Sequence, residues 1–174
     1  MNARLFTALW PDAAVRAQLA AFRDAWAWPP GARPVVDENL HATLHFIGAF
    51  PRERMAALRG ALGGVALEPL SLRLAGTEVW RAGTAVARLD ADPGLLDLHA
   101  RLGATLARIG VVLDERAFAP HVTMARRAAR AGPPALLPEL AWRATGFALV
   151  ESHGGSQAAY ELLKTWGAGE ITPP

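Results

Sequence analysis

The chain has 174 residues, a formal net charge of +2 and no cysteine. A chain of this length is expected to form one compact domain with a substantial core, and we predict a single domain over residues 1–174. The lack of cysteine excludes a disulfide framework and a thiolate zinc site. No apolar run approaches the length of a membrane span, and the small net charge does not favour wrapping around duplex nucleic acid.

The N-terminal segment and the basic residues give two further expectations. The first residues, MNARLFTALWPD, include an arginine, a proline and an aspartate, so the segment is too short and too polar for a secretory signal. We therefore expect a cytoplasmic protein with no membrane partner. Nothing in the sequence demands an obligate protein partner or more than a monomer. The basic residues are 17 arginines and one lysine. Arginine suits bidentate phosphate binding, but the abundance of Arg, Ala, Gly and Pro is also typical of a general compositional bias.

The first part of the chain predicts a strand, a helix and a second strand. Residues 4–9 form an apolar run that favours a buried strand. Asp12 is placed to cap a helix over about 13–26. The stretch 40–47 alternates apolar and polar residues, which indicates a half-buried strand that ends at Gly48.

The order strand, helix, strand recurs in the second half at an offset of 80 residues, in units of about 3–48 and 83–126. We expect a helix at about 51–62, a strand pair at 70–80 and 84–89, a helix at 93–109, a strand at 118–125, and strands at 142–152 and 158–166 joined through 153–155. The duplication predicts an α+β fold of two pseudo-symmetric lobes. Each lobe is expected to be a mostly antiparallel sheet with helices on its outer face, and the two lobes surround a central cleft.

Two short strings of the form His-x-Thr-apolar stand out, HATL at His41–Leu44 and HVTM at His121–Met124. With 5 His and 9 Thr in the chain, random placement predicts about 0.26 copies of His-x-Thr, and two copies arise by chance with a probability of roughly 0.03. The repetition therefore indicates a shared purpose for the two motifs.

The residue types of these motifs suit acid–base chemistry at phosphorus without a metal. On a strand, residues i and i+2 point to the same side, so we expect His41 and Thr43 to face the cleft together with His121 and Thr123. Imidazole accepts or donates a proton near neutral pH. In-line displacement needs a base for the attacking oxygen and an acid for the leaving oxygen, and hydroxyls can hydrogen-bond the non-bridging oxygens. Spacing alone does not say which histidine is the acid.

The chain resembles the two-histidine phosphoesterase superfamily and, within it, the RNA 2′,3′-cyclic phosphodiesterases, also called 2′-5′ RNA ligases. The resemblance rests on RLFTAL, ENLHATLHFIG, RAFAPHVTMAR and a closing segment with Tyr160 and Trp166, and it covers nearly the whole chain. Met124 stands where the relatives usually have leucine.

This resemblance implies hydrolysis of an RNA 2′,3′-cyclic phosphate end to a 2′-phosphate, with the RNA end as partner and with no cofactor and no metal. It also implies that His41 is the proton donor to the leaving ribose oxygen and that His121 accepts a proton from water. Reversal with an RNA 5′-hydroxyl would form a 2′-5′ bond.

Three further side chains are predicted to contact the substrate, namely Arg116, Arg126 and His45. The two arginines flank the second motif as they do in relatives. Strict alternation, however, puts Arg126 on the side of Val122, away from the cleft, where it would be structural unless the strand twists or ends. His45 lies two residues beyond the threonine of the first motif, so alternation puts it on the cleft face.

Two other histidine interpretations bear on the site. His99 falls in the predicted helix 93–109, on the side expected to face solvent. The i, i+4 spacing of His41 and His45 would suit a metal on a helix, but the alternating pattern indicates a strand, and we predict no metal site.

Two alternatives to the RNA enzyme remain open. The same chemistry could act on a small cyclic nucleotide or on a cyclic phosphate derived from ADP-ribose, because loop shape decides the substrate. A non-catalytic RNA-end-binding module is the alternative from a different class, although pure binding does not need a matched acid and base.

Overall fold

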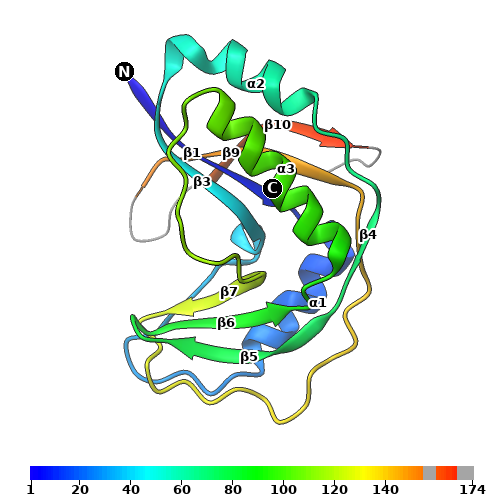
Figure 1. Cartoon of the computed structure of the whole chain (residues 1–174). Coiled ribbons are helices and arrows are strands. Elements are labelled where there is room, and N and C mark those ends of the chain that lie inside the picture. Colours follow the sequence, from blue (N-terminus) through cyan, green and yellow to red (C-terminus); the bar gives the residue numbers. More distant parts are fainter. Residues whose placement is uncertain (155–159, 168–174) are drawn as a thin grey trace.

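The computed structural model describes residues 1–154 and 160–167 (Figure 1). The strands are β1 (Asn2–Leu9), β2 (Arg33–Pro34), β3 (Ala42–Pro51), β4 (Leu70–Leu72), β5 (Leu74–Trp80), β6 (Thr84–Leu89), β7 (His121–Arg126), β8 (Trp142–Ala144), β9 (Gly146–Ser152) and β10 (Tyr160–Gly167). The helices are α1 (Ala13–Asp24), α2 (Met55–Gly63) and α3 (Pro93–Arg108), with short 3₁₀ turns η1 (Asp37–Asn39) and η2 (Arg52–Arg54).

The large sheet has two halves that meet between the two motif strands. Its order is β10-β9-β1-β3-β7-β6-β5, with β2 paired to β7, and its pairings are antiparallel. The ladder between β3 and β7 consists of Ala42 opposite Val122. These residues directly follow His41 and His121, so the join between the halves lies inside the paired motifs. A small separate sheet pairs β4 with β8.

The helices α1 and α3 each lie against the half of the sheet that does not contain the strand before them. Although α1 follows β1 in the chain, it lies beside the β5–β6–β7 half, whereas α3 follows β6 and lies with α2 over the β1–β3 half (Figure 1). Both α1 and α3 begin at an aspartate. Asp12 Oδ1 accepts the N–H of Val15 at 2.8 Å, and Asp92 Oδ1 accepts the N–H of Gly94 at 2.8 Å. Such caps satisfy backbone donors that the helix itself leaves unpaired.

One hydrophobic core runs through both halves and takes buried leucines from all three helices. A second, smaller cluster consists of Phe6, Ala8, Trp10, Ala148 and Val150. Along β1, the members of this cluster alternate with Leu5 and Leu9, which belong to the main core. Because side chains on a strand alternate between its faces, the second cluster lies on the opposite face of the sheet from α2 and α3.

The predicted α+β class is confirmed by these elements, while several boundaries differ. β3 runs past Gly48 to Pro51, because Gly48 adopts a φ of +75° at a bulge in which Ile47 is the extra residue. Glycine takes this left-handed conformation without steric cost. The predicted strand 142–152 is interrupted at Thr145 into β8 and β9, which belong to different sheets.

Two sequence-based expectations are not decided by the elements. Residues 155–159, which include part of the predicted hairpin at 153–155, lie outside the described residues. The single domain over 1–174 and its duplicated units stay predictions. Among the helices of the described chain, none combines the length and apolarity needed to cross a bilayer.

Candidate active site

The two motif histidines lie on the same face of the sheet, on either side of the join between its halves. Ala42 and Val122 pair across the join and belong to the core, so the residues before and after them point to the other face. The histidine and threonine of both motifs are half-buried there. His121 is close enough to His41 for its charge to lower the pKa of His41. We call this side of the sheet the motif face.

His41 is held by the backbone and by aromatic rings. Its Nδ1 lies 2.7 Å from the carbonyl oxygen of Asn39, and since a carbonyl only accepts, Nδ1 carries the proton. Its Nε2 lies 3.1 Å from Oγ1 of Thr43. The ring stacks on Trp10, with centroids 5.0 Å apart and planes 4° apart, and Tyr160 stands edge-on at 5.4 Å. These contacts leave Nε2 as the nitrogen available for proton transfer.

His121 has the same backbone tether but different neighbours. Its Nδ1 lies 2.7 Å from the carbonyl oxygen of Ala119, two residues earlier, as in the first motif. The ring packs edge-on against Trp80, with centroids 4.4 Å apart and an interplanar angle of 67°. Arg88 stands opposite His121 in the β6–β7 ladder. The tether therefore fixes the same tautomer in both histidines, while the surroundings of His121 are more charged.

Both histidines favour the neutral form in the free protein. Burial, helped by the charges of His121 and Arg126, lowers the pKa of His41 to about 4. Burial also lowers the pKa of His121, and Arg88 and Arg126 act in the same direction. Because Arg126 acts on the pKa of both rings, its guanidinium lies within electrostatic range of the whole motif pair.

A β-bulge follows the threonine of each motif. In the β1–β3 ladder, Thr43 and His45 pair with successive residues, so Leu44 is the extra residue. In the β6–β7 ladder, Thr123 and Ala125 pair with successive residues, so Met124 is the extra residue. A bulge keeps two successive side chains on one side and reverses the alternation beyond it.

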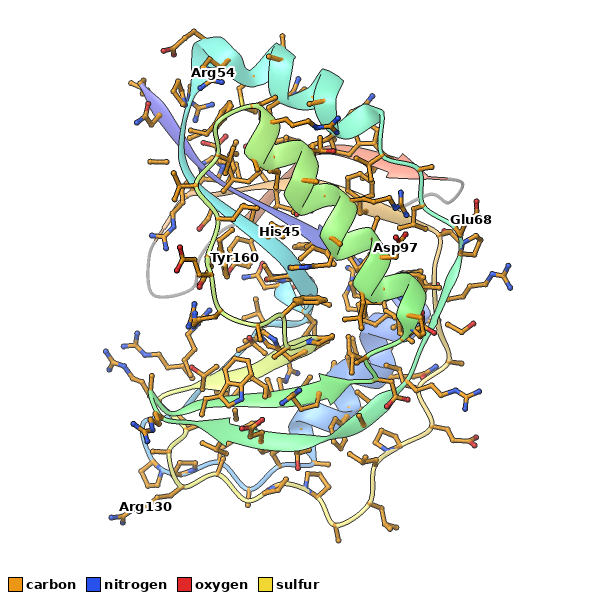
Figure 2. The ribbon with its side chains drawn as sticks, viewed as in Figure 1. His45, Arg54, Glu68, Asp97, Arg130 and Tyr160 are labelled. Atoms are coloured by element: carbon orange, nitrogen blue, oxygen red, sulfur yellow. The ribbon has the colours of Figure 1, made fainter. Side chains whose placement is uncertain are left out.

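The first bulge puts His45 on the core side, so the prediction that His45 faces the cleft is wrong. Its residue is 9% exposed, and its Nε2 donates to the carbonyl of His99 at 2.7 Å. Its ring stacks on that of His99, with centroids 3.9 Å apart, and Figure 2 shows His45 next to α3. The N–H of His45 donates to Oγ1 of buried Thr7 at 3.2 Å, which satisfies a donor that the bulge removes from the ladder. Unbroken alternation failed because Leu44 is the extra residue.

A stack of three aromatic rings joins the two motifs. The ring of His99 lies against His45 and against Phe118, with centroids 3.8 Å apart and planes 9° apart in the second pair. His99 also hydrogen-bonds the carbonyl of Leu44, and burial lowers its pKa to about 4. The prediction that His99 faces solvent is therefore wrong. Since Phe118 lies three residues before His121, the stack connects the bulge of the first motif to the segment that leads into the second.

The second bulge turns Arg126 towards the motif face, whereas strict alternation puts it on the core side. Met124 and Ala125 are both fully buried, and Arg126 is exposed. Its effect on the pKa of both motif histidines agrees with this direction. Eighty residues earlier, Phe46 holds the equivalent place beyond the first bulge and is 58% exposed. An exposed aromatic ring and a guanidinium thus hold matching places.

Sequence reasoning does not single out Arg88, although the ladder places it beside His121. The guanidinium forms an ion pair with Glu78 at 2.8 Å. The carboxylate of Glu78 also accepts a hydrogen bond from Trp80, which helps to lower the pKa of Glu78. This group surrounds one side of His121. Only the pairing of β6 with β7 reveals it, since the pattern within one strand carries no information on its partner.

Arg116 lies in the segment between α3 and β7, where it binds an acidic neighbour. Its Nε lies 2.8 Å from Oδ2 of Asp114, and its side chain is 85% exposed. In the described part of the chain, Arg116 makes no contact with either motif histidine. The structure brings His41, Thr43, His121, Thr123 and Arg126 together and leaves Arg116 apart, so its role at the substrate stays a prediction.

Potential metal ligands occur in two places. His41 and His45 point to opposite faces of the sheet, so they do not converge on one ion. On β9 and its following turn and on β10, Glu151, His153 and Glu161 bring ligand atoms within 4.8 Å of one another. These groups are already engaged, because Glu151 pairs with Arg52 and His153 Nε2 lies 2.9 Å from a carboxylate oxygen of Glu161.

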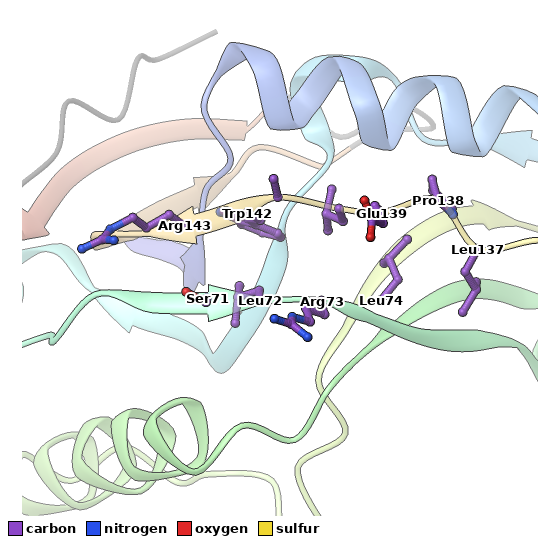
Figure 3. Close-up of a pocket in the computed structure, with 11 residues that line it drawn as sticks. Ser71, Leu72, Arg73, Leu74, Leu137, Pro138, Glu139, Trp142 and Arg143 are labelled. Carbon is purple, nitrogen blue, oxygen red and sulfur yellow. The ribbon is translucent and has the colours of Figure 1, made fainter.

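A surface groove lies away from the motifs. It is bounded by β4, β8 and the segment 137–141, and Arg73, Trp142 and Arg143 are among the residues that line it (Figure 3). None of the predicted site residues lines this groove. The chemistry that the sequence predicts therefore belongs to the motif face.

The motif face can accept a proton on one side of a bound anionic group and donate a proton on its other side. Each histidine presents Nε2 while its Nδ1 is tied to a carbonyl. The hydroxyl of Thr43 lies beside His41, Thr123 follows His121 at the matching position, and Arg126 supplies a nearby positive charge. An anionic group bound between the rings would have an acid or a base on each side and donors for its oxygens, which is what displacement at phosphorus requires.

Comparison with known proteins agrees with this chemistry. The profile of the 2′-5′ RNA ligase superfamily matches residues 10–156. The chain is 32% identical over 170 residues to the RNA 2′,3′-cyclic phosphodiesterase of Escherichia coli (strain K12), a match that covers 94% of this chain and 95% of that protein. It is 35% identical over 167 residues to the RNA 2′,3′-cyclic phosphodiesterase of Thermus thermophilus, covering 86% and 81%. The crystal structure of Escherichia coli LigT complexed with 3′-AMP matches with a TM-score of 0.82 and 29% identity, covering 98% of this chain and 100% of that one.

Proposed function

This chain belongs to the 2′-5′ RNA ligase superfamily, and we propose that it is an RNA 2′,3′-cyclic phosphodiesterase in which His41 and His121 are the paired proton donor and acceptor. The observation that carries the proposal is the matched tether of the two rings, each with Nδ1 on a backbone carbonyl and Nε2 on the motif face. The curated relatives named RNA 2′,3′-cyclic phosphodiesterase support the substrate.

His121 is the proton acceptor in this proposal. Burial and the neighbouring guanidinium groups lower the pKa of His121, which keeps Nε2 unprotonated at neutral pH. Nε2 takes a proton from water as the water oxygen attacks phosphorus. The new P–O bond forms on the side of the phosphate opposite the leaving oxygen.

His41 is the proton donor. As the bond between phosphorus and the ribose O3′ breaks, Nε2 of His41 gives its proton to O3′, leaving a 2′-phosphate and a 3′-hydroxyl. In the free protein, burial keeps the pKa of His41 at about 4. The negative charge of a bound phosphodiester favours the imidazolium, so substrate binding itself supplies the protonated donor.

Three side chains stabilise the phosphate in this scheme. The hydroxyls of Thr43 and Thr123 hydrogen-bond the non-bridging oxygens, where charge accumulates in the transition state. Arg126 adds a positive charge on the same face. The scheme uses no metal and no cofactor, and its reversal with an RNA 5′-hydroxyl as the attacking group gives a 2′-5′ bond.

The test is to incubate the protein, in EDTA, with a short RNA that ends in a 2′,3′-cyclic phosphate and to identify the new end. We expect a 2′-phosphate from the wild type and none from His121→Ala. Arg59→Gln, which removes a charge from the exposed surface of α2, is the matched control and should retain full activity.

Other results would overturn parts of the proposal. A 3′-phosphate would keep the two-histidine chemistry but reverse the leaving oxygen. Turnover only after a divalent metal is added would exclude the metal-free scheme. RNA that binds but does not react would favour the RNA-end-binding module, and turnover of a small cyclic nucleotide but not of RNA would change the substrate class.

A further inference from the structure

Arginines that lack an acidic partner gather at one end of β7. Arg33 of β2 stands directly opposite Arg126 in the β2–β7 ladder, and like charges placed opposite each other destabilise a sheet. Arg127 follows Arg126, and the turn between β5 and β6 contributes Arg81. All four are exposed. We call Arg33, Arg81, Arg126 and Arg127 the arginine rim.

The hydrogen bonds around the turn hold this rim together. The N–H of Ala128 donates to the carbonyl of Gly83 at 2.7 Å, and the N–H of Gly83 donates to the carbonyl of Trp80 at 2.8 Å. The first bond fixes the β5–β6 turn, which carries Arg81, against the residue after Arg127. Figure 2 shows nitrogen-tipped side chains at the end of the sheet where β5 turns into β6.

The backbone of Arg127 is strained. Its φ is +54°, and among non-glycine residues of the described chain it is the one with a positive φ. This conformation costs roughly 1–2 kcal/mol for a residue with a β-carbon. The strained backbone of Arg127 turns the chain directly after the end of β7.

Five arginines elsewhere in the described part of the fold have acidic partners. Within the described residues, those ion-paired to carboxylates are Arg23, Arg52, Arg88, Arg101 and Arg116. Among the described residues, the four rim arginines form neither such an ion pair nor a side-chain hydrogen bond. Without its four charges the chain, formally +2, would stand at −2. The rim is thus a local concentration of positive charge on a protein that is otherwise slightly acidic.

The rim is continuous with the active site. Arg126 acts on the pKa of both motif histidines. On the β5 side, Trp80 contacts the ring of His121 and immediately precedes Arg81. A polyanion whose end is bound between the histidines can therefore reach the rim without crossing the rest of the protein.

We propose that the arginine rim binds the phosphates of the RNA strand that precede the reacting 2′,3′-cyclic phosphate. A cyclic phosphate closes on the last ribose, so the remainder of the RNA leaves the site through the 5′-oxygen of that ribose and carries one phosphate per nucleotide. Guanidinium groups bind such phosphates in a bidentate manner. This inference rests on the proposed function for the position of the reacting end, and it adds that the strand follows β7 and β2 instead of β1, β9 and β10.

The test compares two substrates with the same reacting end. These are a mononucleoside 2′,3′-cyclic phosphate and a ten-nucleotide RNA that ends in one. The double variant Arg33→Gln/Arg127→Gln should lower kcat/KM for the RNA by about tenfold or more, mainly through KM. Its kcat/KM for the mononucleotide should fall far less, because the mononucleotide has no preceding phosphates. Arg59→Gln should leave the preference for RNA unchanged.

Salt dependence gives a second readout. For single strands, each phosphate contact contributes a slope of about −0.7 to the logarithm of affinity against the logarithm of salt concentration. The slope for the ten-nucleotide RNA should therefore be shallower by about one to two in the double variant. The slope for the mononucleotide should stay the same.

A binding measurement separates this inference from the proposed function. A fluorescent ten-nucleotide RNA that ends in a 3′-phosphate needs no turnover, and it should bind the wild type more tightly than the double variant. If the wild type and the double variant bound this RNA equally well, the proposed role of the arginine rim would be wrong, even if the protein were an active phosphodiesterase. If Arg59→Gln weakened RNA binding equally, the effect would come from net charge and not from the position of the rim. If RNA length had no influence while an acidic protein bound the rim, the partner would be of another class.

Discussion

The two motif strands are built on one plan and differ in what surrounds each histidine. Both histidines tie Nδ1 to the carbonyl two residues earlier, and both motifs are followed by a bulge at their fourth position. The ladders, however, place the residue after β1, Trp10, in the neighbourhood of His41, and place Arg88 opposite His121. An indole contacts each ring, but His121 also stands opposite a guanidinium in its ladder, and this makes the two sites chemically different.

The bulges are satisfied in different ways as well. The carbonyl of Leu44 accepts a hydrogen bond from the ring of His99, whereas the carbonyl of Met124 accepts the backbone N–H of Val35 at 2.8 Å. A side chain from α3 therefore supports the first motif, and the chain next to β2 supports the second. Two motifs of the same form thus keep the same backbone tether although the residues that support them differ.

The largest expected effect comes from separating donor from acceptor. His41→Ala and His121→Ala should each lower kcat on the RNA cyclic phosphate by about 100-fold or more. When sulfur replaces the leaving O3′, the departing thiolate needs little protonation, so His41→Ala should regain most of its loss and His121→Ala should not. Steady-state rates on both substrates measure this. Equal rescue of the two variants would contradict the assigned roles.

The next effect tests the charges around the second motif. The active pair needs one proton, and in the free protein the pKa values of both histidines lie below 6.5. The one-proton form is therefore lost as pH rises, and kcat/KM should fall up to tenfold per pH unit above that range. Arg126→Gln removes a charge that lowers both pKa values, so the descending limb should move to higher pH while KM rises.

Arg88→Gln sharpens this test, because Arg88 acts on the pKa of His121 and is not among the groups that shift His41. This variant should move the limb of the pH profile that His121 controls to higher pH, because a charge that lowers the pKa of His121 is removed. Its change in KM should be smaller than that of Arg126→Gln. A pH profile of kcat/KM for the three proteins decides the matter. Identical profiles would show that these charges do not control the histidine pair.

A smaller effect concerns the stack behind the first motif. His99→Ala leaves the buried carbonyl of Leu44 without its partner and removes the ring between His45 and Phe118, which should cost about 1–3 kcal/mol of stability. We expect kcat to fall several-fold with little change in KM, because the stack positions strands and does not touch substrate. His99→Phe keeps a ring but not the hydrogen bond, so it should recover part of the stability. Chemical denaturation and steady-state kinetics give both values.

The smallest effects come from the two helix caps, in which an aspartate accepts backbone N–H groups at the start of α1 and of α3. Asp12→Ala and Asp92→Ala should each lower the free energy of unfolding by about 1 kcal/mol and leave kcat unchanged. Asp90→Ala, two residues before the second cap on an exposed site, is the matched control. A large loss of activity from either cap variant would mean that the helices do more than support the sheet.

Local patterns in the sequence anticipate much of this molecule. The cap at Asp12, the helix that begins at Pro93 and the histidine–threonine pairs depend on neighbours three or four residues away or closer. A bulge depends on the partner strand, so the directions of His45 and Arg126 could not be read from alternation alone. The sequence LHATLHFI fits a continuous strand as well as a bulged one. Arg88 was invisible for the same reason, since only cross-strand pairing brings it to His121.

The single residue pair that links β3 to β7 has a mechanical consequence. When the two halves of the sheet tilt relative to each other about Ala42 and Val122, displacement grows with distance from that axis. In such a tilt the outer strands β10 and β5 are displaced furthest. The distance between His41 and His121, each one residue from the axis, changes least. In the proposed mechanism, such a tilt would change the approach for a long substrate more than the distance between the two histidines that transfer protons.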